Sequence, residues 1–146
     1  MRLERDIVIG RPVAEVFAYV SEPANLPSWQ PAVAEVRRPE GELAAGSSFG
    51  ETRTFVGKRF ETTVEVVELE PDRSFAIRVV GGPVPISVRH SFEPADGGTR
   101  VTISGEVELR GALRVAGALM AKAAAHDAGA SLARLKALLE QRGTAS

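Results

Sequence analysis

A proline-bounded segment near the start of the chain most restricts how this sequence can fold. Residues 11–31 contain four prolines, and each proline limits the length of a helix. Pro12 suits the first position of a helix, and apolar residues follow it at helical spacing, namely Val13, Val16, Phe17 and Val20. We predict two short helices here, inserted after one apolar strand over residues 3–9.

Six stretches after Pro31 have the composition and spacing of β-strands. They are rich in Val, Ile, Thr and Phe and are separated by short turn sequences. The predicted strands cover residues 32–38, 47–56, 59–69, 74–80, 84–93 and 99–109. Short connections favour antiparallel neighbours, so these strands are expected to form a meander.

The last part of the chain, residues 112–141, is predicted as one long helix because strong helix formers dominate it. One face carries Leu113, Met120, Ala124, Ala128, Leu132, Leu135 and Leu139. A helix of this length spans about 40 to 45 Å and can cross a whole sheet. We therefore predict a single α+β domain over residues 1–142, with a disordered tail over 143–146. A curved seven-stranded antiparallel sheet would wrap around the long helix in the order β-α-α-β6-α.

Composition and charge exclude several classes of protein. The chain has no cysteine, so it forms no disulfide and no thiolate metal site. Its net charge is -1, with acidic and basic residues interleaved, which argues against a nucleic-acid partner. No stretch approaches the roughly 18 apolar residues of a membrane span, and the charged N-terminus is unlike a signal peptide. We expect a cytoplasmic protein, monomeric or homodimeric, that does not insert stably into membranes.

Motifs for common cofactors and metals are missing from the sequence. There is no glycine-rich phosphate loop and no Gly-x-Ser-x-Gly motif. His90 and His126 are the only histidines, and no second ligand stands at metal-binding spacing from either. We expect no metal and no cofactor.

Three segments resemble one known family. Residues 12–31 resemble the opening of the polyketide cyclase/dehydrase-like proteins, which belong to the helix-grip superfamily with the START lipid-transfer domains and the Bet v 1 pollen allergens. Residues 92–102 resemble the turn into that family's last strand, and residues 132–140 resemble the end of its final helix. Together the resemblance covers nearly the whole chain.

The resemblance implies a helix-grip fold with a cavity between the curved sheet and the C-terminal helix. Such cavities take lipids, sterols, polyketides, quinones or other apolar molecules, and some family members cyclise or dehydrate polyketides. Function does not follow from fold alone. The chemistry must therefore be sought in individual residues.

Strand alternation predicts which side chains face the helix. His90 shares parity with the apolar residues of its strand and is predicted to point inward. In the third strand Phe49 and Phe55 share parity with Glu51 and Arg53, which would bring two charges inside. Buried charges are costly unless paired, so the alternatives are a bulge that resets the parity or a strand end open to water.

Each candidate polar residue has two interpretations. His90 is either a core histidine hydrogen-bonded to a neighbour or a general acid or base acting with Glu51 or Arg53. Tyr19 either donates to a ligand oxygen or covers the rim of the cavity. Trp29, the only tryptophan, is predicted to cover one end of the cavity. The loop over residues 81–85 is either a gate or a plain hairpin turn.

We expect a protein that carries or sequesters a small apolar molecule. The predicted ligand-binding residues are Phe17, Trp29, Phe49, Arg53, Phe60, Phe75, Ile77, Val88, His90, Phe92, Val107 and Met120. The alternatives are a cyclase or dehydratase, with His90 as acid or base and Arg53 or Tyr19 polarising a carbonyl, and a partner-binding protein with a vestigial cavity.

Overall fold

The computed structural model describes residues 2–55, 57–81, 85–107 and 113–144. In chain order its elements are β1 (Arg2–Ile9), α1 (Val13–Val20), the short 3₁₀ helix η1 (Pro23–Asn25), α2 (Leu26–Trp29), β2 (Val33–Arg37), β3 (Ser48–Phe55), β4 (Lys58–Glu70), β5 (Ser74–Val80), β6 (Ile86–Ala95), β7 (Gly98–Val107) and α3 (Leu113–Thr144).

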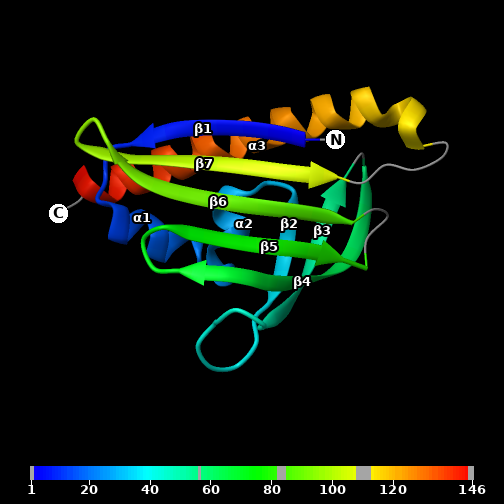
Figure 1. Ribbon diagram of the computed structural model, residues 1–146, viewed down its shortest axis with the longest axis horizontal. Coiled ribbons are helices and arrows are strands. Elements are labelled where there is room, and N and C mark those ends of the chain that lie inside the picture. Colours follow the sequence, from blue (N-terminus) through cyan, green and yellow to red (C-terminus); the bar gives the residue numbers. More distant parts are fainter. Residues whose placement is uncertain (1, 56, 82–84, 108–112, 145–146) are drawn as a thin grey trace.

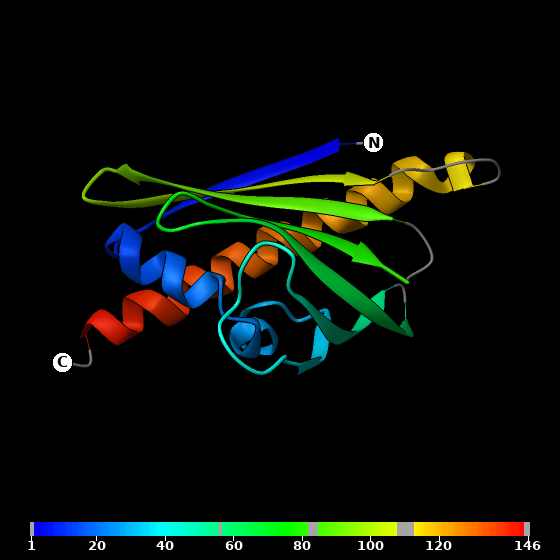
Figure 2. The ribbon, with the colours of Figure 1, turned by 60° about the horizontal axis from the view of Figure 1, so that its bottom comes forward.

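The strands form one antiparallel sheet in the order β1-β7-β6-β5-β4-β3-β2. Strands β2 to β7 are neighbours in chain order, as their short connections predict, and β1 pairs with β7 at the far edge. The long helix α3 crosses one face of the sheet (Figure 1). Figure 2 shows α1 and α2 on the same side of the sheet as α3. The predicted α+β helix-grip architecture is therefore confirmed.

Two details at helix ends differ from the predictions. Pro12 precedes α1 in an extended conformation, with φ -61° and ψ 148°, and its carbonyl accepts the Val16 N–H at 3.1 Å. At the other end of the chain, α3 continues to Thr144. Gly143 and Thr144 were predicted as tail, but they extend the helix because strong helix formers precede them. Residues 145 and 146 lie outside the described part of the chain.

Hydrogen bonds from α3 hold it against the edge strand β1. The Lys136 ammonium donates to the carbonyl of Val8 at 2.7 Å and to Glu140 Oε2 at 2.6 Å. The same Glu140 oxygen accepts the Gly10 N–H at 2.9 Å, and these two bonds to Lys136 and Gly10 lower the pKa of Glu140. The helix therefore satisfies backbone groups at the end of β1 that no further strand could pair.

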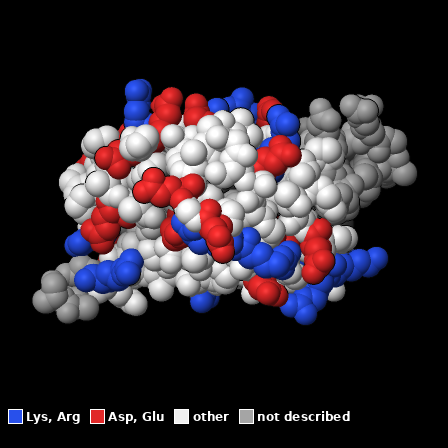
Figure 3. Space-filling model, turned by 90° about the horizontal axis from the view of Figure 1, so that it is seen from below, with Lys and Arg blue, Asp and Glu red and all other residues white. Residues whose placement is uncertain are grey.

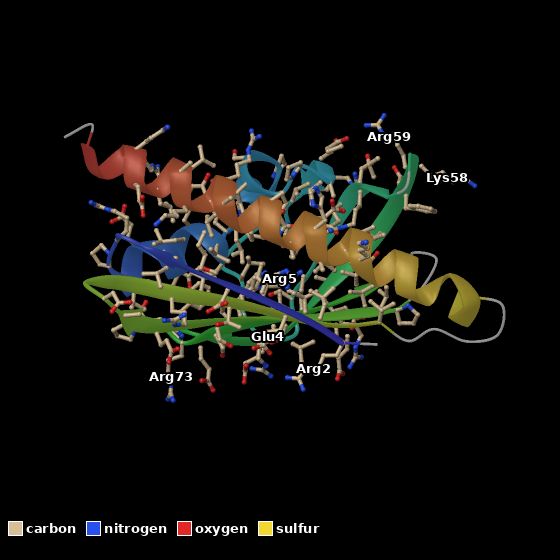
Figure 4. The ribbon with its side chains drawn as sticks, turned by 90° about the horizontal axis from the view of Figure 1, so that it is seen from above. Arg2, Glu4, Arg5, Lys58, Arg59 and Arg73 are labelled. Carbon is tan, nitrogen blue, oxygen red and sulfur yellow. The ribbon has the colours of Figure 1, made fainter. Side chains whose placement is uncertain are left out.

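The sheet has an outer face that carries charged side chains and an inner face that α3 covers. Arg2 and Glu4 of β1 point away from α3 in Figure 4, as does Arg73 of the turn before β5. On the side of the molecule seen in Figure 3, Lys and Arg side chains are interspersed with Asp and Glu. The described side chains of that side therefore form no patch of a single sign.

A close approach between β1 and β7 predicts a strong effect for Gly98→Ala. A β-carbon at Gly98 would lie 2.1 Å from the carbonyl oxygen of Ile9 and 3.0 Å from the α-carbon of Gly10. Both contacts are to backbone, so the strands themselves would have to move. We expect the free energy of unfolding to fall by about 1 to 3 kcal/mol, measured by urea denaturation.

Gly105→Ala is the matched control for Gly98→Ala, because it lies in the same strand. Its β-carbon would lie 3.6 Å from Leu3 Cγ, an ordinary contact. The expected change is within about 0.5 kcal/mol. Equal effects of the two substitutions would contradict the close approach.

Candidate functional site

A chain of hydrogen-bonded polar groups lies on the inner face where β3 and β4 meet α2. Arg53 Nε donates to Glu51 Oε1 at 2.9 Å, and Arg53 Nη2 donates to Gln30 Oε1 at 3.2 Å. Thr62, directly opposite Glu51 in the pairing of β3 with β4, donates to Glu51 Oε1 at 3.4 Å. Two strands and the end of α2 thus hold a single ion pair from three sides.

Burial decides the question of parity in β3. The side chain of Glu51 is 1% exposed and that of Arg53 is 28% exposed. Register shifts occur between Val33 and Glu35 of β2 and between Val66 and Glu68 of β4, while the pairing of β3 with β4 runs unbroken from Ser48 to Phe55. Glu51 therefore faces inward, and Arg53 lies at the open end of the pair.

A second group of side chains adjoins this ion pair through Trp29, the neighbour of Gln30. The Trp29 ring meets the His90 ring edge to face, with 6.2 Å between the ring centroids. The His90 ring in turn stacks on Phe75, with 5.6 Å between the centroids. The His90 Nδ1 lies 3.0 Å from the carbonyl oxygen of Phe75. A carbonyl can only accept, so this nitrogen carries the proton and donates.

His90 is neutral at physiological pH. Burial lowers the pKa of His90 from 6.5 to about 4. The hydrogen bond to Phe75 opposes this shift, and the positive charge of Arg53 adds to it. A group with this pKa is a weak base near pH 7 and holds almost no ionisable proton to give as an acid. The geometry favours the predicted core role of His90.

Two buried polar atoms in the same region have no hydrogen-bond partner among the described residues. They are Glu51 Oε2 and Trp29 Nε1, one an acceptor and the other a donor. Leaving such an atom unpaired typically costs about 1 to 3 kcal/mol, and more where it is charged. Unpaired buried atoms often mark a place where a ligand or water completes the network.

The inner face is closely packed at one end and open at the other. Leu132, Leu135 and Leu139 of α3 are at most 2% exposed. Toward the start of the helix the same stripe continues with Ala124 and Ala128, which are only half-buried. On the sheet, four inward-facing apolar residues are likewise only half-buried.

The partly uncovered residues of the sheet form an apolar surface. They share the inward parity of their strands and are all half-buried: Phe60 of β4, Ile86 and Val88 of β6, and Val107 of β7. Phe60 lies directly opposite Arg53 in the pairing of β3 with β4. We call these four residues the open apolar surface. The buried Ile77 and Val79 of β5 lie between β4 and the three residues of β6 and β7, so Phe60 is the member that borders the Glu51–Arg53 pair.

The predicted ligand-binding residues fall into three sets. Those on or beside the open apolar surface are Arg53, Phe60, Val88 and Val107. Those buried in the core are Phe17, Trp29, Phe49, Phe75, Ile77, His90 and Phe92. The side chain of Met120 lies outside the described part of the structure, as does most of the predicted gate loop, residues 82–84.

Tyr19 lies apart from the polar cluster, so its position does not support the alternative in which Tyr19, in place of Arg53, polarises a carbonyl beside His90. It lines a separate surface groove of about 440 Å³ with Asn25, Leu138, Gln141 and Arg142. The guanidinium of Arg142 lies 5.3 Å from the centre of the Tyr19 ring. The reason is its position: Tyr19 sits at the end of α1, beside the last turns of α3.

Sequence reasoning missed two members of the polar cluster, Gln30 and Thr62. Thr62 shares parity with buried valines of β4 and could have been found from the strand pairing alone. Gln30 gave no such signal, because it follows the end of α2 and reaches Arg53 only through the tertiary fold.

In the described part of the chain, no helix is long and apolar enough to span a membrane.

Several solved structures share this fold. A START superfamily protein from Mycobacterium smegmatis superposes with a TM-score of 0.80 at 16% identity, covering 96% of this chain and 97% of that one. The protein TTHA0849 from Thermus thermophilus gives 0.80 at 16% identity, covering 93% and 94%. At such identities the similarity concerns the fold alone.

The di-domain ARO/CYC StfQ from the steffimycin biosynthetic pathway gives a TM-score of 0.81 at 17% identity, covering 98% of this chain and 51% of StfQ. This chain thus spans about half the length of that protein. No curated protein matches the sequence. A family model described as "Polyketide cyclase / dehydrase and lipid transport" matches residues 1–140. The resemblance is confirmed, and the chain belongs to the polyketide cyclase/dehydrase and lipid transport family.

Proposed function

We propose that this protein binds a small apolar molecule between the sheet and α3, and carries or sequesters it. The observation that carries the proposal is the open apolar surface formed by Phe60, Ile86, Val88 and Val107. Inward-facing apolar residues at the packed end of the same sheet are almost completely buried. An apolar ligand at the open end would remove the remaining surface from water.

The polar groups beside this surface suit a binding site. Small-molecule sites are mostly apolar and contain a few placed polar groups that orient the ligand. Arg53 is such a group, because it is partly exposed and borders Phe60. The family description, which includes lipid transport, and the similarity to a START superfamily protein support a ligand of this class.

The burial and the lowered pKa of His90 favour ligand binding without turnover. The cyclase or dehydratase alternative assigns His90 the role of acid or base. Its buried ring and its lowered pKa of about 4 are poorly suited to that role at neutral pH. We therefore propose a carrier rather than an enzyme.

Substitution of neighbouring residues of β6 tests the proposal. Val88 faces α3, whereas Ser87 is exposed on the opposite face. Val88→Trp should fill the open apolar surface and weaken binding of the neutral fluorescent probe N-phenyl-1-naphthylamine at least tenfold, since an indole leaves no room for it. Binding is measured by the rise in probe fluorescence.

Ser87→Trp introduces the same side chain on the outer face and should leave the affinity for the probe unchanged. The far-ultraviolet circular dichroism of both variants checks that they fold. Equal binding of the probe by Val88→Trp and the wild type, or no binding by the wild type, would refute the proposed site.

A further inference from the structure

We propose that Glu51 makes this site selective for neutral apolar molecules that carry a hydroxyl group, over carboxylates of the same size. The inference rests on the proposed function, because it concerns the polar end of the molecule bound there. It follows from the charge balance of the Glu51–Arg53 pair and from the donors and acceptors that the pair leaves free.

The positive charge of Arg53 is balanced within the site by Glu51. An arginine beside an apolar surface would by itself attract carboxylates, with which guanidinium groups form strong paired hydrogen bonds. Here Glu51 Oε1 lies 2.9 Å from Arg53 Nε and balances that charge. An incoming carboxylate would meet both the attraction of Arg53 and the repulsion of Glu51, and would still have to lose its water. A neutral molecule avoids most of that cost.

Two of the three nitrogen atoms of the Arg53 guanidinium donate to protein groups. Its Nε and Nη2 atoms are engaged by Glu51 and Gln30. Its Nη1 atom has no partner in the described part of the structure, and the side chain is 28% exposed. A ligand oxygen next to Phe60 can therefore accept a hydrogen bond from Nη1, because Arg53 and Phe60 are directly opposite in the strand pairing.

The carboxylate of Glu51 has one oxygen that a ligand could use as an acceptor. Glu51 Oε2 is buried and lacks a donor among the described residues. A hydroxyl both donates and accepts, whereas a carboxylate or an ester can only accept. The terminal torsion of a carboxylate is soft, so a small rotation of Glu51 would present Oε2 to a hydroxyl held by Arg53. The buried Trp29 Nε1 remains as a donor for a second oxygen.

Competition against N-phenyl-1-naphthylamine tests this selectivity with three molecules of equal chain length, 1-decanol, methyl decanoate and decanoate. The wild type should bind 1-decanol more tightly than either of the others. The methyl ester carries the same chain and an acceptor oxygen but no donor, so a preference for the alcohol isolates its donated hydrogen bond. The comparison needs no variant and is decisive even if a substitution at Glu51 prevents folding.

Glu51→Gln should shift the ratio of decanol to decanoate affinity toward decanoate by about tenfold to a hundredfold, the range expected for a hydrogen bond to a charged group. Glu61→Gln is the matched control, since Glu61 is exposed on the outer face of β4 and its loss changes the net charge equally. That variant should keep the wild-type ratio.

Two results would overturn the inference. One is wild-type binding of methyl decanoate or decanoate at least as tight as that of 1-decanol, and the other is an equal ratio in Glu51→Gln and Glu61→Gln. Either result leaves the proposed function standing as long as Val88→Trp still weakens probe binding. Failure of the wild type to bind the probe and all three competitors would instead refute the proposed function itself.

Discussion

Replacing Trp29 with alanine is expected to lower the free energy of unfolding by about 3 to 5 kcal/mol, the usual cost of truncating a buried aromatic residue. Trp29 is 0% exposed and is the largest fully buried side chain among the described residues. Its ring packs against His90 at 6.2 Å and lies at the end of α2, where it joins the short helices to the sheet. Its removal leaves a cavity that the rigid sheet cannot close.

Trp29→Phe and Val67→Ala provide the comparison for this prediction. Phenylalanine keeps much of the buried ring and removes the unpaired indole N–H. We therefore expect Trp29→Phe to lower the free energy of unfolding by well under half as much as Trp29→Ala does. Val67 is 51% exposed, and its truncation should change stability by no more than about 0.5 kcal/mol. Urea denaturation followed by circular dichroism measures all three. A loss below about 1 kcal/mol in Trp29→Ala would contradict the central position of this residue.

The second large effect is a loss of stability in mild acid that is caused by His90. Its pKa is about 4 in the folded protein, because burial disfavours the charged form, and about 6.5 in the unfolded chain. Between these values the unfolded state binds a proton that the folded state does not, so stability falls as the pH is lowered from 6.5 to 4. The full difference between the two pKa values of His90 corresponds to about 3 kcal/mol of unfolding free energy.

His90→Gln should remove this part of the pH dependence, because glutamine does not titrate. Carboxylates such as Glu22 and Glu140, whose pKa values are lowered in the folded protein, lose their contribution as the pH falls further, in both proteins alike. The difference between the wild-type and His90→Gln profiles of unfolding free energy against pH therefore isolates His90. Parallel profiles between pH 6.5 and 4 would show that His90 is not buried in its neutral form.

Local sequence patterns predicted the fold well because each element depends on its own periodicity. The alternation in β3 left the direction of Glu51 open because of the cost of burying a carboxylate, and the structure places its side chain inside at 1% exposed. The short turns predicted antiparallel neighbours from β2 to β7. Among the strand pairings, that of β1 with β7 joins residues too distant in the chain for any local pattern to indicate.

The composition of the site was harder to predict, because parity indicates a face but not a distance along it. Alternation predicts the inner face for His90 and leaves Arg53 open, and only the path of α2 brings Trp29 to His90 and Gln30 to Arg53. The hydroxyl of Tyr19 has suitable chemistry for the same site. The approach of the last turns of α3 places Tyr19 instead against Arg142, in a different groove.

By itself, the sequence determined the proline-bounded helices, the curved sheet and the inward direction of His90, since these follow from local spacing and strand alternation. Only the tertiary structure decided that Glu51 neutralises Arg53, that His90 is buried in its neutral form, and that the inner face stays open beside Phe60. Charge balance and burial are sums over groups that meet in space. They exist only once the sheet has curved around α3.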